Sequence, residues 1–135
     1  MVVDKPNLYV IDSSALLPYF LPDEKLPFSI KSTINKFINN RISLIAPSIL
    51  KYEIGNALKS SVKRKRLNNI DAEKIYSSFL NFPIQYLSPN YSDTMTLSLK
   101  YDLSYYDASY LCLAQEQKAK LLTLDKKLKE CKPSL

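Results

Sequence analysis

The sequence predicts an α/β protein whose central parallel sheet of four or five short strands carries helices on both faces. Three observations lead to this prediction. Short apolar runs alternate along the chain with longer segments of helical periodicity. Prolines and capping residues stand at the boundaries between these segments. No linker, internal repeat or low-complexity stretch interrupts residues 1–135, so we expect a single domain.

The first half of the chain contributes two expected strands and three expected helices. Both strands are runs of four mostly apolar residues, as in strands buried on both faces of a parallel sheet. Each helix begins at a serine or a proline, residue types that suit a helix start. In order, the elements are a strand at residues 8–11, a helix at 13–20, a helix at 27–39, a strand at 43–46 and a long helix at about 47–65.

The second half of the chain continues the alternation. Asp71 is most simply the cap of the next helix, which Pro83 ends. A helix opened by Asp107 and a strand ended by Asp125 complete the pattern. The elements are a helix at residues 71–82, a strand at 84–87, a helix at 91–101, and a helix and a strand within 103–125.

The composition excludes several classes of enzyme. The chain has no histidine, which removes Ser-His-Asp and Cys-His nucleophiles and most zinc and iron sites. Its single glycine, Gly55, cannot build a Walker loop or a G-x-G-x-x-G dinucleotide loop. Cys112 and Cys131 are too few and too far apart for a disulfide framework. Hydrolytic chemistry would therefore need carboxylates, hydroxyls, lysines or a hard metal ion.

The charge of the chain favours a polyanionic partner. Lys and Arg outnumber Asp and Glu by 19 to 13, a net charge of +6. The run Lys63, Arg64, Lys65 and Arg66 ends the long helix, where it is either a solvated helix end or a patch that grips phosphates. The absence of a long apolar run or a secretory signal predicts a soluble, cytoplasmic protein with no membrane partner.

Four acidic residues stand where an open parallel sheet places its ligand site. Asp12 and Asp125 each follow an expected strand. Asp107 shares a core-facing helix stripe with Tyr110, and Glu53 borders the apolar stripe of the long helix. Taken singly, Asp107 and Asp125 are most simply helix caps and Glu53 a solvated helix former. Four acids at one edge would repel one another unless a hard divalent cation were bound.

Residues beside two of these acids carry further signals. Asp12 need not cap the first helix, because Ser13 and Ser14 can do so. Gly55 and Asn56 are poor helix residues that follow one another in the long helix. Their succession indicates a close backbone approach or a side-chain hydrogen bond at that point.

The acids lie in four sequence patterns that together resemble a known family. The patterns are Val-Ile-Asp12-Ser-Ser, Tyr-Glu53-Ile-Gly-Asn56-Ala-Leu, Tyr-Tyr-Asp107-Ala-Ser-Tyr-Leu-Cys-Leu-Ala and Leu-Leu-Thr123-Leu-Asp125. With their order and spacing, they resemble the PIN domain, and more narrowly the VapC-type toxins of type II toxin-antitoxin pairs. The resemblance spans about residues 8–130. It departs from the family after Cys131, where Pro133 argues against the usual fifth strand.

The resemblance implies an endoribonuclease that depends on Mg²⁺ or Mn²⁺. Asp12, Glu53, Asp107 and Asp125 would form its acidic pocket. We assign Asp12 and Asp107 as direct metal ligands, with Glu53 and Asp125 binding through water or holding a second ion. Because the chain lacks imidazole, the metal would activate the attacking water.

The resemblance also implies supporting residues and partners. Ser13, Asn56 and Thr123 would support the pocket. The substrate would be RNA, with the run that begins at Lys63 as one candidate contact. The family implies a homodimer that a cognate antitoxin protein silences by covering the site.

Two other functions stay open at this point. One is a PIN module that processes RNA or acts by binding nucleic acid or protein, with a pocket that no longer cuts. The presence of all four acids argues against a silent pocket. The other is a doubly wound domain that accepts phosphate on an aspartate. That chemistry usually requires paired acids near the first strand, and the haloacid-dehalogenase pattern requires a second aspartate at the position of Ser14. This chain has neither feature.

Overall fold

A four-stranded parallel sheet forms the centre of the fold in the computed structural model, which describes residues 7–131. The strand order is β3-β2-β1-β4, and all neighbouring strands are parallel. The central residue Val10 pairs with Ile45 on one side and Leu121 on the other. The strands are β1 (Leu8–Ile11), β2 (Ser43–Ala46), β3 (Gln85–Tyr86) and β4 (Lys120–Leu122).

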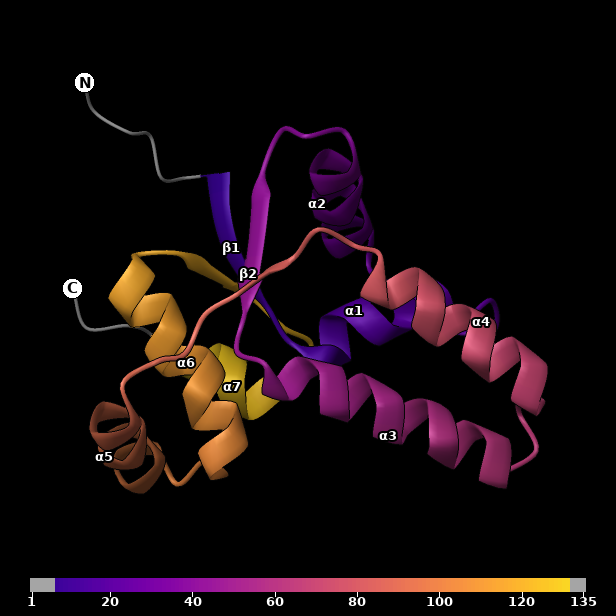
Figure 1. The fold of residues 1–135 in the computed structure, drawn as a ribbon. Coiled ribbons are helices and arrows are strands. Elements are labelled where there is room, and N and C mark those ends of the chain that lie inside the picture. The colour runs from indigo at the N-terminus through magenta and orange to yellow at the C-terminus, as the bar shows by residue number, and fades with distance from the viewer. Residues whose placement is uncertain (1–6, 132–135) are drawn as a thin grey trace.

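Helices cover both faces of this sheet, so the α/β prediction is confirmed. Figure 1 shows α5, α6 and α7 on one side of the strands and α1, α2 and α4 on the other. The helices within the described residues are α1 (Ser13–Phe20), α2 (Phe28–Ile38), α3 (Ile49–Lys63), α4 (Asn69–Leu80), α5 (Tyr91–Tyr101), α6 (Tyr105–Gln117) and α7 (Lys126–Glu130).

Helix α6 is buried at the centre of the fold. Residues 108–114 are all buried, so this part of the helix has no solvent-facing side. It packs against β1 and β4 of the sheet and against α5. A helix enclosed in this way is apolar around its circumference rather than along one stripe. Its first turn, which carries Asp107, is thereby held at the carboxyl edge of the strands.

The predictions that Asp71 and Asp107 cap their helices are wrong. The side chain of Asn68 caps α4 by accepting a hydrogen bond from the backbone N–H of Asp71, which lies in the first turn. The side chain of Ser104 caps α6 in the same way, accepting from the N–H of Asp107. In both helices a polar residue three positions earlier takes the cap, and the aspartate is left to face the positive end of the helix dipole.

The remaining differences concern element ends. The long helix α3 begins at Ile49 and ends at Lys63, because Pro47 and Ser48 form the turn that leads into it. The strand β3 has two residues instead of the four expected. The possible fifth strand falls on residues 132–135, outside the described part of the chain. Among residues 7–131, no helix has the length and apolar character to cross a membrane.

Candidate functional site

The four acids reach the carboxyl edge of the sheet from separate elements. Asp12 follows β1 and begins α1, and Asp125 follows β4 and begins α7. Glu53 lies in the second turn of α3, the helix after β2. Asp107 lies in the first turn of α6. Three parallel strands therefore direct their following segments to one place, and α6 enters it from the side.

The electrostatics of the acids show that they lie close together. Burial raises the pKa of Asp107, and the charge of Asp125 raises it further. Burial likewise raises the pKa of Glu53, with added repulsion from Asp107 and Asp12. Asp12, Asp107 and Asp125 thus each make ionisation of another acid less favourable, as expected for carboxylates that share a site.

Asp12 is the most enclosed of the four, with 4% of its surface exposed. Its Oδ1 accepts hydrogen bonds from the Ser14 hydroxyl at 2.7 Å and from the Ala15 N–H at 3.1 Å. Its Oδ2 accepts one from the Thr123 hydroxyl at 2.5 Å. Burial raises the pKa of Asp12 although these bonds favour the charged form. Asp12 also caps α1, although Ser13 and Ser14 offered alternative caps in the sequence.

Ser14 and Thr123 join the ends of β1 and β4 around Asp12. Their hydroxyl oxygens lie 3.2 Å apart. The Ser14 oxygen also accepts the N–H of Leu124 at 2.9 Å, and the Thr123 oxygen accepts the N–H of Asp125 at 3.0 Å. Sequence reasoning did not single out Ser14, because two adjacent serines give no local signal of which one turns toward β4.

Glu53 is held by residues from two other helices. The Tyr110 hydroxyl of α6 donates to Glu53 Oε1 at 2.5 Å. A hydrogen bond from the Ser13 side chain of α1 also favours the charged form of Glu53, yet burial keeps its pKa raised. Tyr110 is fully buried, and burial together with Glu53 raises the pKa of its phenol, which therefore stays a donor. The sequence did not identify Tyr110 as a site residue, because a tyrosine on the core-facing helix stripe that it shares with Asp107 is most simply a core residue.

Asp125 combines two roles in the described structure. Its Oδ1 accepts the N–H of Leu128 at 2.9 Å and so caps α7, as the simplest interpretation predicted. Its charge also acts on Asp107 across the site. Because capping uses one oxygen, the other is available to the acid cluster.

The donor set suits a hard divalent cation. Every candidate ligand is a carboxylate oxygen, the type that Mg²⁺ and Mn²⁺ prefer. Burial is the main cause of the raised pKa values, and a cation would offset both the burial of the charges and the repulsion that adds to it. Within residues 7–131, the side chains as they stand do not bring three acids within ligation distance of one ion. Mg²⁺ commonly binds through one or two carboxylates and keeps several waters, and this arrangement can provide such a site.

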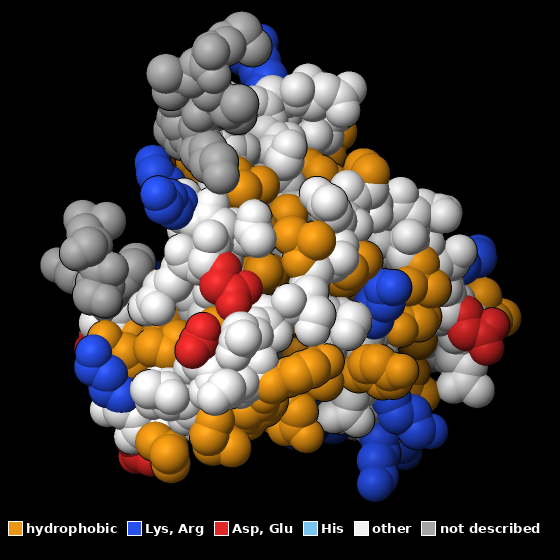
Figure 2. All heavy atoms as spheres, turned by 60° about the vertical axis from the view of Figure 1, so that its left-hand side comes forward, with side chains coloured by type: hydrophobic (Ala, Val, Ile, Leu, Met, Phe, Trp, Pro, Cys, Tyr) orange, Lys and Arg blue, Asp and Glu red, His pale blue; other side chains and the backbone are white. Residues whose placement is uncertain are grey.

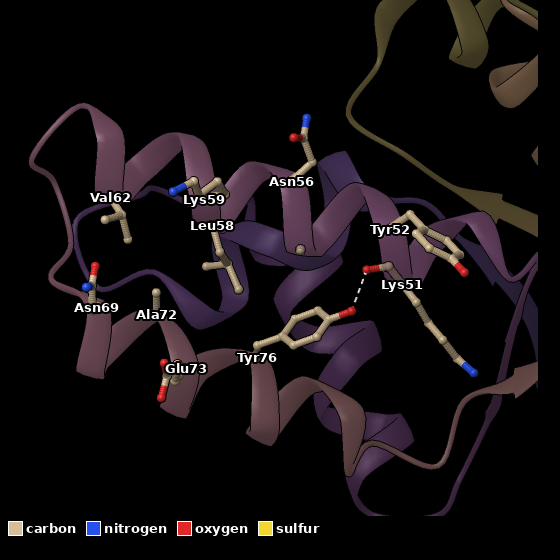
Figure 3. A pocket seen from close by; sticks show the side chains of 11 residues that line it. Lys51, Tyr52, Asn56, Leu58, Lys59, Val62, Asn69, Ala72, Glu73 and Tyr76 are labelled. Carbon is tan, nitrogen blue, oxygen red and sulfur yellow. Dashed lines mark hydrogen bonds between the residues drawn. The ribbon is translucent and has the colours of Figure 1, made fainter.

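The two poor helix residues of α3, Gly55 and Asn56, lie on different sides of that helix. Gly55 faces α4, where a Cβ atom would lie 3.4 Å from the Tyr76 ring. The Tyr76 hydroxyl donates to the Lys51 carbonyl at 2.8 Å, beside a cavity of about 520 Å³ between α3 and α4 (Figure 3). A Cβ atom at this distance would make an ordinary van der Waals contact, so the packing against Tyr76 does not require a glycine at this position. Asn56 is exposed and lies on the side of α3 away from Tyr76 in Figure 3.

The basic run lies at the far end of α3. Lys63 is ten residues beyond Glu53, or about 15 Å along the helix, and Figure 1 shows this end far from the strands. All four side chains of the run are exposed. Arg66 pairs with Asp23 at 3.3 Å and with Glu24 at 3.9 Å. Arg66 therefore ties the loop after α3 to the segment between α1 and α2.

The chain belongs to the PIN domain family, whose model matches residues 9–132. The family assignment made from the sequence is thus confirmed. Two relatives from Pyrobaculum aerophilum are similar over most of their length. Ribonuclease VapC3 is 28% identical over 130 residues, which cover 93% of this chain and 95% of the relative. Exonuclease VapC9 is 28% identical over 130 residues, which cover 91% of this chain and 84% of the relative.

A solved structure supports the same fold. The crystal structure of PAE2754 from Pyrobaculum aerophilum superposes with a TM-score of 0.69 at 25% sequence identity. The match covers 91% of this chain and 78% of that chain. The parallel sheet and its helices therefore have a counterpart in an experimentally determined structure.

Proposed function

We propose that this protein is a metal-dependent endoribonuclease of the VapC type, the toxin of a toxin-antitoxin pair. The observation that carries the proposal is Asp12, a buried carboxylate fixed by three hydrogen bonds, whose charge interacts with Asp107 and Glu53. Asp125 acts in turn on Asp107. The family and the names of the two relatives, a ribonuclease and an exonuclease, support hydrolysis of phosphodiester bonds.

Asp12 and Asp107 are the direct ligands in this proposal. A bound Mg²⁺ or Mn²⁺ ion supplies a water of lowered pKa and offsets charge on the phosphate. Ser14 and Thr123 hold the Asp12 carboxylate in one orientation, so it needs no rearrangement to bind a cation. Asp125 completes the acidic pocket, where it binds the metal through a water molecule or holds a second ion.

Glu53 is the proposed acceptor of the proton from the attacking water. Its raised pKa makes it a stronger base than an exposed glutamate. Tyr110 occupies Oε1, which leaves Oε2 as the oxygen that takes the proton. Ser13 supports Glu53 rather than Asp12.

The partners follow from the same proposal. RNA is the substrate, and Lys63, Arg64 and Lys65 are candidate contacts to its backbone beyond the acids, since Arg66 is engaged with Asp23 and Glu24. A cognate antitoxin would cover the site, and the chain would act as a homodimer formed from single domains of residues 1–135. The cytoplasmic location stays a prediction.

Cleavage of labelled single-stranded RNA tests the function. The wild-type protein should cut with Mg²⁺ or Mn²⁺ and stop with a chelator, and Asp12→Asn and Asp107→Asn should lose activity while circular dichroism shows an intact fold. Asp93→Asn is the matched control, because Asp93 holds the same first-turn place in α5 that Asp107 holds in α6. Activity that survives both site changes would overturn the proposal, and RNA binding without cleavage would favour the silent module.

A further inference from the structure

A small neutral pocket lies between the start of α3 and the helices α5 and α6. Its volume is about 180 Å³, and its lining includes three tyrosines and four serine or threonine residues. No lysine, arginine, aspartate or glutamate is among the described residues that line it. The pocket therefore suits an uncharged group with polar edges.

This pocket adjoins the acids on the same two helices. Ile49, which lines the pocket, lies four residues, or about 6 Å along the helix, before Glu53 on α3. Tyr106 of its wall directly precedes Asp107 on α6 and lies one turn before Tyr110, the partner of Glu53. A ligand held at the acids can therefore reach into the pocket with its neighbouring group.

The side chains of the pocket offer both stacking and hydrogen bonding. Tyr91 and Tyr106 are 73% and 58% exposed, so ring surface is open to a ligand. The Ser48 hydroxyl makes no capping bond to α3, and Ser88 donates to the Tyr91 hydroxyl at 3.3 Å. On the face in Figure 2, which brings the left-hand side of Figure 1 forward, side chains of the hydrophobic class, which includes tyrosine, gather along the middle and lower edge. Acidic side chains lie among them left of the centre, and most lysines and arginines lie toward the margins.

We propose that this pocket binds one unstacked base of the RNA strand, next to the phosphate held at the acids. A phosphate group finds no cation in the pocket wall, whereas a base can stack on tyrosine and present its edge to the hydroxyls. The proposal rests on the proposed nuclease function, and it adds a binding site for one base of the substrate. The pocket then selects among RNA sequences by the fit of that one base.

Steady-state kinetics on single-stranded RNA test the pocket. Tyr91→Leu and Tyr106→Leu should each raise KM roughly tenfold and leave kcat within about twofold, because stacking is lost away from the reacting atoms. Tyr106→Phe keeps the ring and should keep KM. Tyr52→Leu is the matched control, since Tyr52 is also 73% exposed but lines the cavity between α3 and α4. An unchanged KM in the double variant Tyr91→Leu, Tyr106→Leu overturns the inference.

A binding measurement separates this inference from the proposed function. Protein labelled with 3-fluorotyrosine is titrated, in the presence of a chelator, with a short single-stranded RNA and with an abasic strand of the same length. The fluorine signals of Tyr91 and Tyr106 should shift with the RNA but not with the abasic strand, whether or not any cleavage occurs. The signal of Tyr52 should not distinguish the strands.

Two other results would overturn the base pocket. The first is equal shifts with both strands, which would mean that only the backbone is bound. The second is a change from dimer to monomer in the two leucine variants, seen by light scattering, with KM unchanged. That result would assign the tyrosines to an interface between copies of the chain. Failure of RNA cleavage with every metal tested would count against the nuclease instead, while the fluorine shifts would still decide the pocket.

Discussion

The Tyr110 hydroxyl donates a hydrogen bond to the Glu53 carboxylate over 2.5 Å, and the two residues are 57 positions apart in the sequence. Tyr110 belongs to the buried helix α6, and Glu53 to α3, which leads away from the sheet. The bond therefore fixes the position of α3 relative to the rigid centre of the fold. It also engages Oε1 of Glu53, so that Oε2 is the oxygen left to accept a proton in the proposed reaction.

Tyr110→Phe should shift the pH dependence of cleavage. The tyrosine donor lowers the pKa of Glu53 against the raising effect of burial, so its loss should raise that pKa further. If Glu53 must be ionised to accept a proton, the acid limb of kcat/KM should move to higher pH. The pH–rate profile measures the shift, and the loss of the hydrogen bond should also lower the free energy of unfolding by about 1 kcal/mol.

Tyr76→Phe provides the control for that experiment. Its hydroxyl donates to the Lys51 carbonyl at 2.8 Å, so this change also removes a tyrosine hydrogen bond to α3. It should reduce stability by a similar amount, about 1 kcal/mol, and leave the acid limb in place. Equal profiles for the two variants would mean that the Tyr110 hydroxyl has no effect on Glu53.

Thr123→Val should weaken both stability and activity. Valine has nearly the same shape but removes the donor to Asp12 Oδ2, so a buried carboxylate loses a charge-assisted hydrogen bond. We expect a loss of about 2 kcal/mol in urea unfolding and a clear fall in cleavage rate. Thr123→Ser keeps the hydroxyl and should stay close to wild type in both measurements. A valine variant as active as wild type would show that Asp12 needs no such support.

Without metal, Asp12→Asn should be more stable than wild type at about pH 7. Burial and mutual repulsion raise the pKa values of Asp12, Glu53 and Asp107. Groups with raised pKa values favour the folded state below their ordinary pKa and lose that contribution as pH rises through the raised value. The stability gap between variant and wild type should therefore shrink as pH falls from about 7 to about 4, as thermal unfolding can show.

Divalent metal should raise the melting temperature of the wild type at neutral pH. A cation that binds only the folded protein shifts unfolding by mass action, and here it also relieves the repulsion among the acids. Asp12→Asn and Asp107→Asn should lose most of the response to Mn²⁺, whereas Asp93→Asn should keep it. The response should weaken at about pH 5, where protons compete for the carboxylates. A full response in Asp107→Asn would remove that residue from the proposed ligands.

Local features of the sequence determined much of this protein. Apolar runs and capping residues predicted the strands and helices, because those signals act over a few neighbouring residues. The family patterns around Asp12 and Asp107 led to the PIN domain, which the family match confirms. Where two polar residues compete within one turn, as Ser104 and Asp107 do, the sequence did not show which would cap the helix.

Only the tertiary structure decided how the acids are held. Ser14, rather than Ser13, contacts Asp12 because its hydroxyl also meets Thr123, 109 positions away on the segment after β4. Tyr110 reaches Glu53 because the fold brings α6 and the first turns of α3 to the same edge of the sheet. Such contacts depend on the relative placement of elements that the sequence lists far apart. A helical period shows which residues share a face, but only the packing of the helices determines what that face meets.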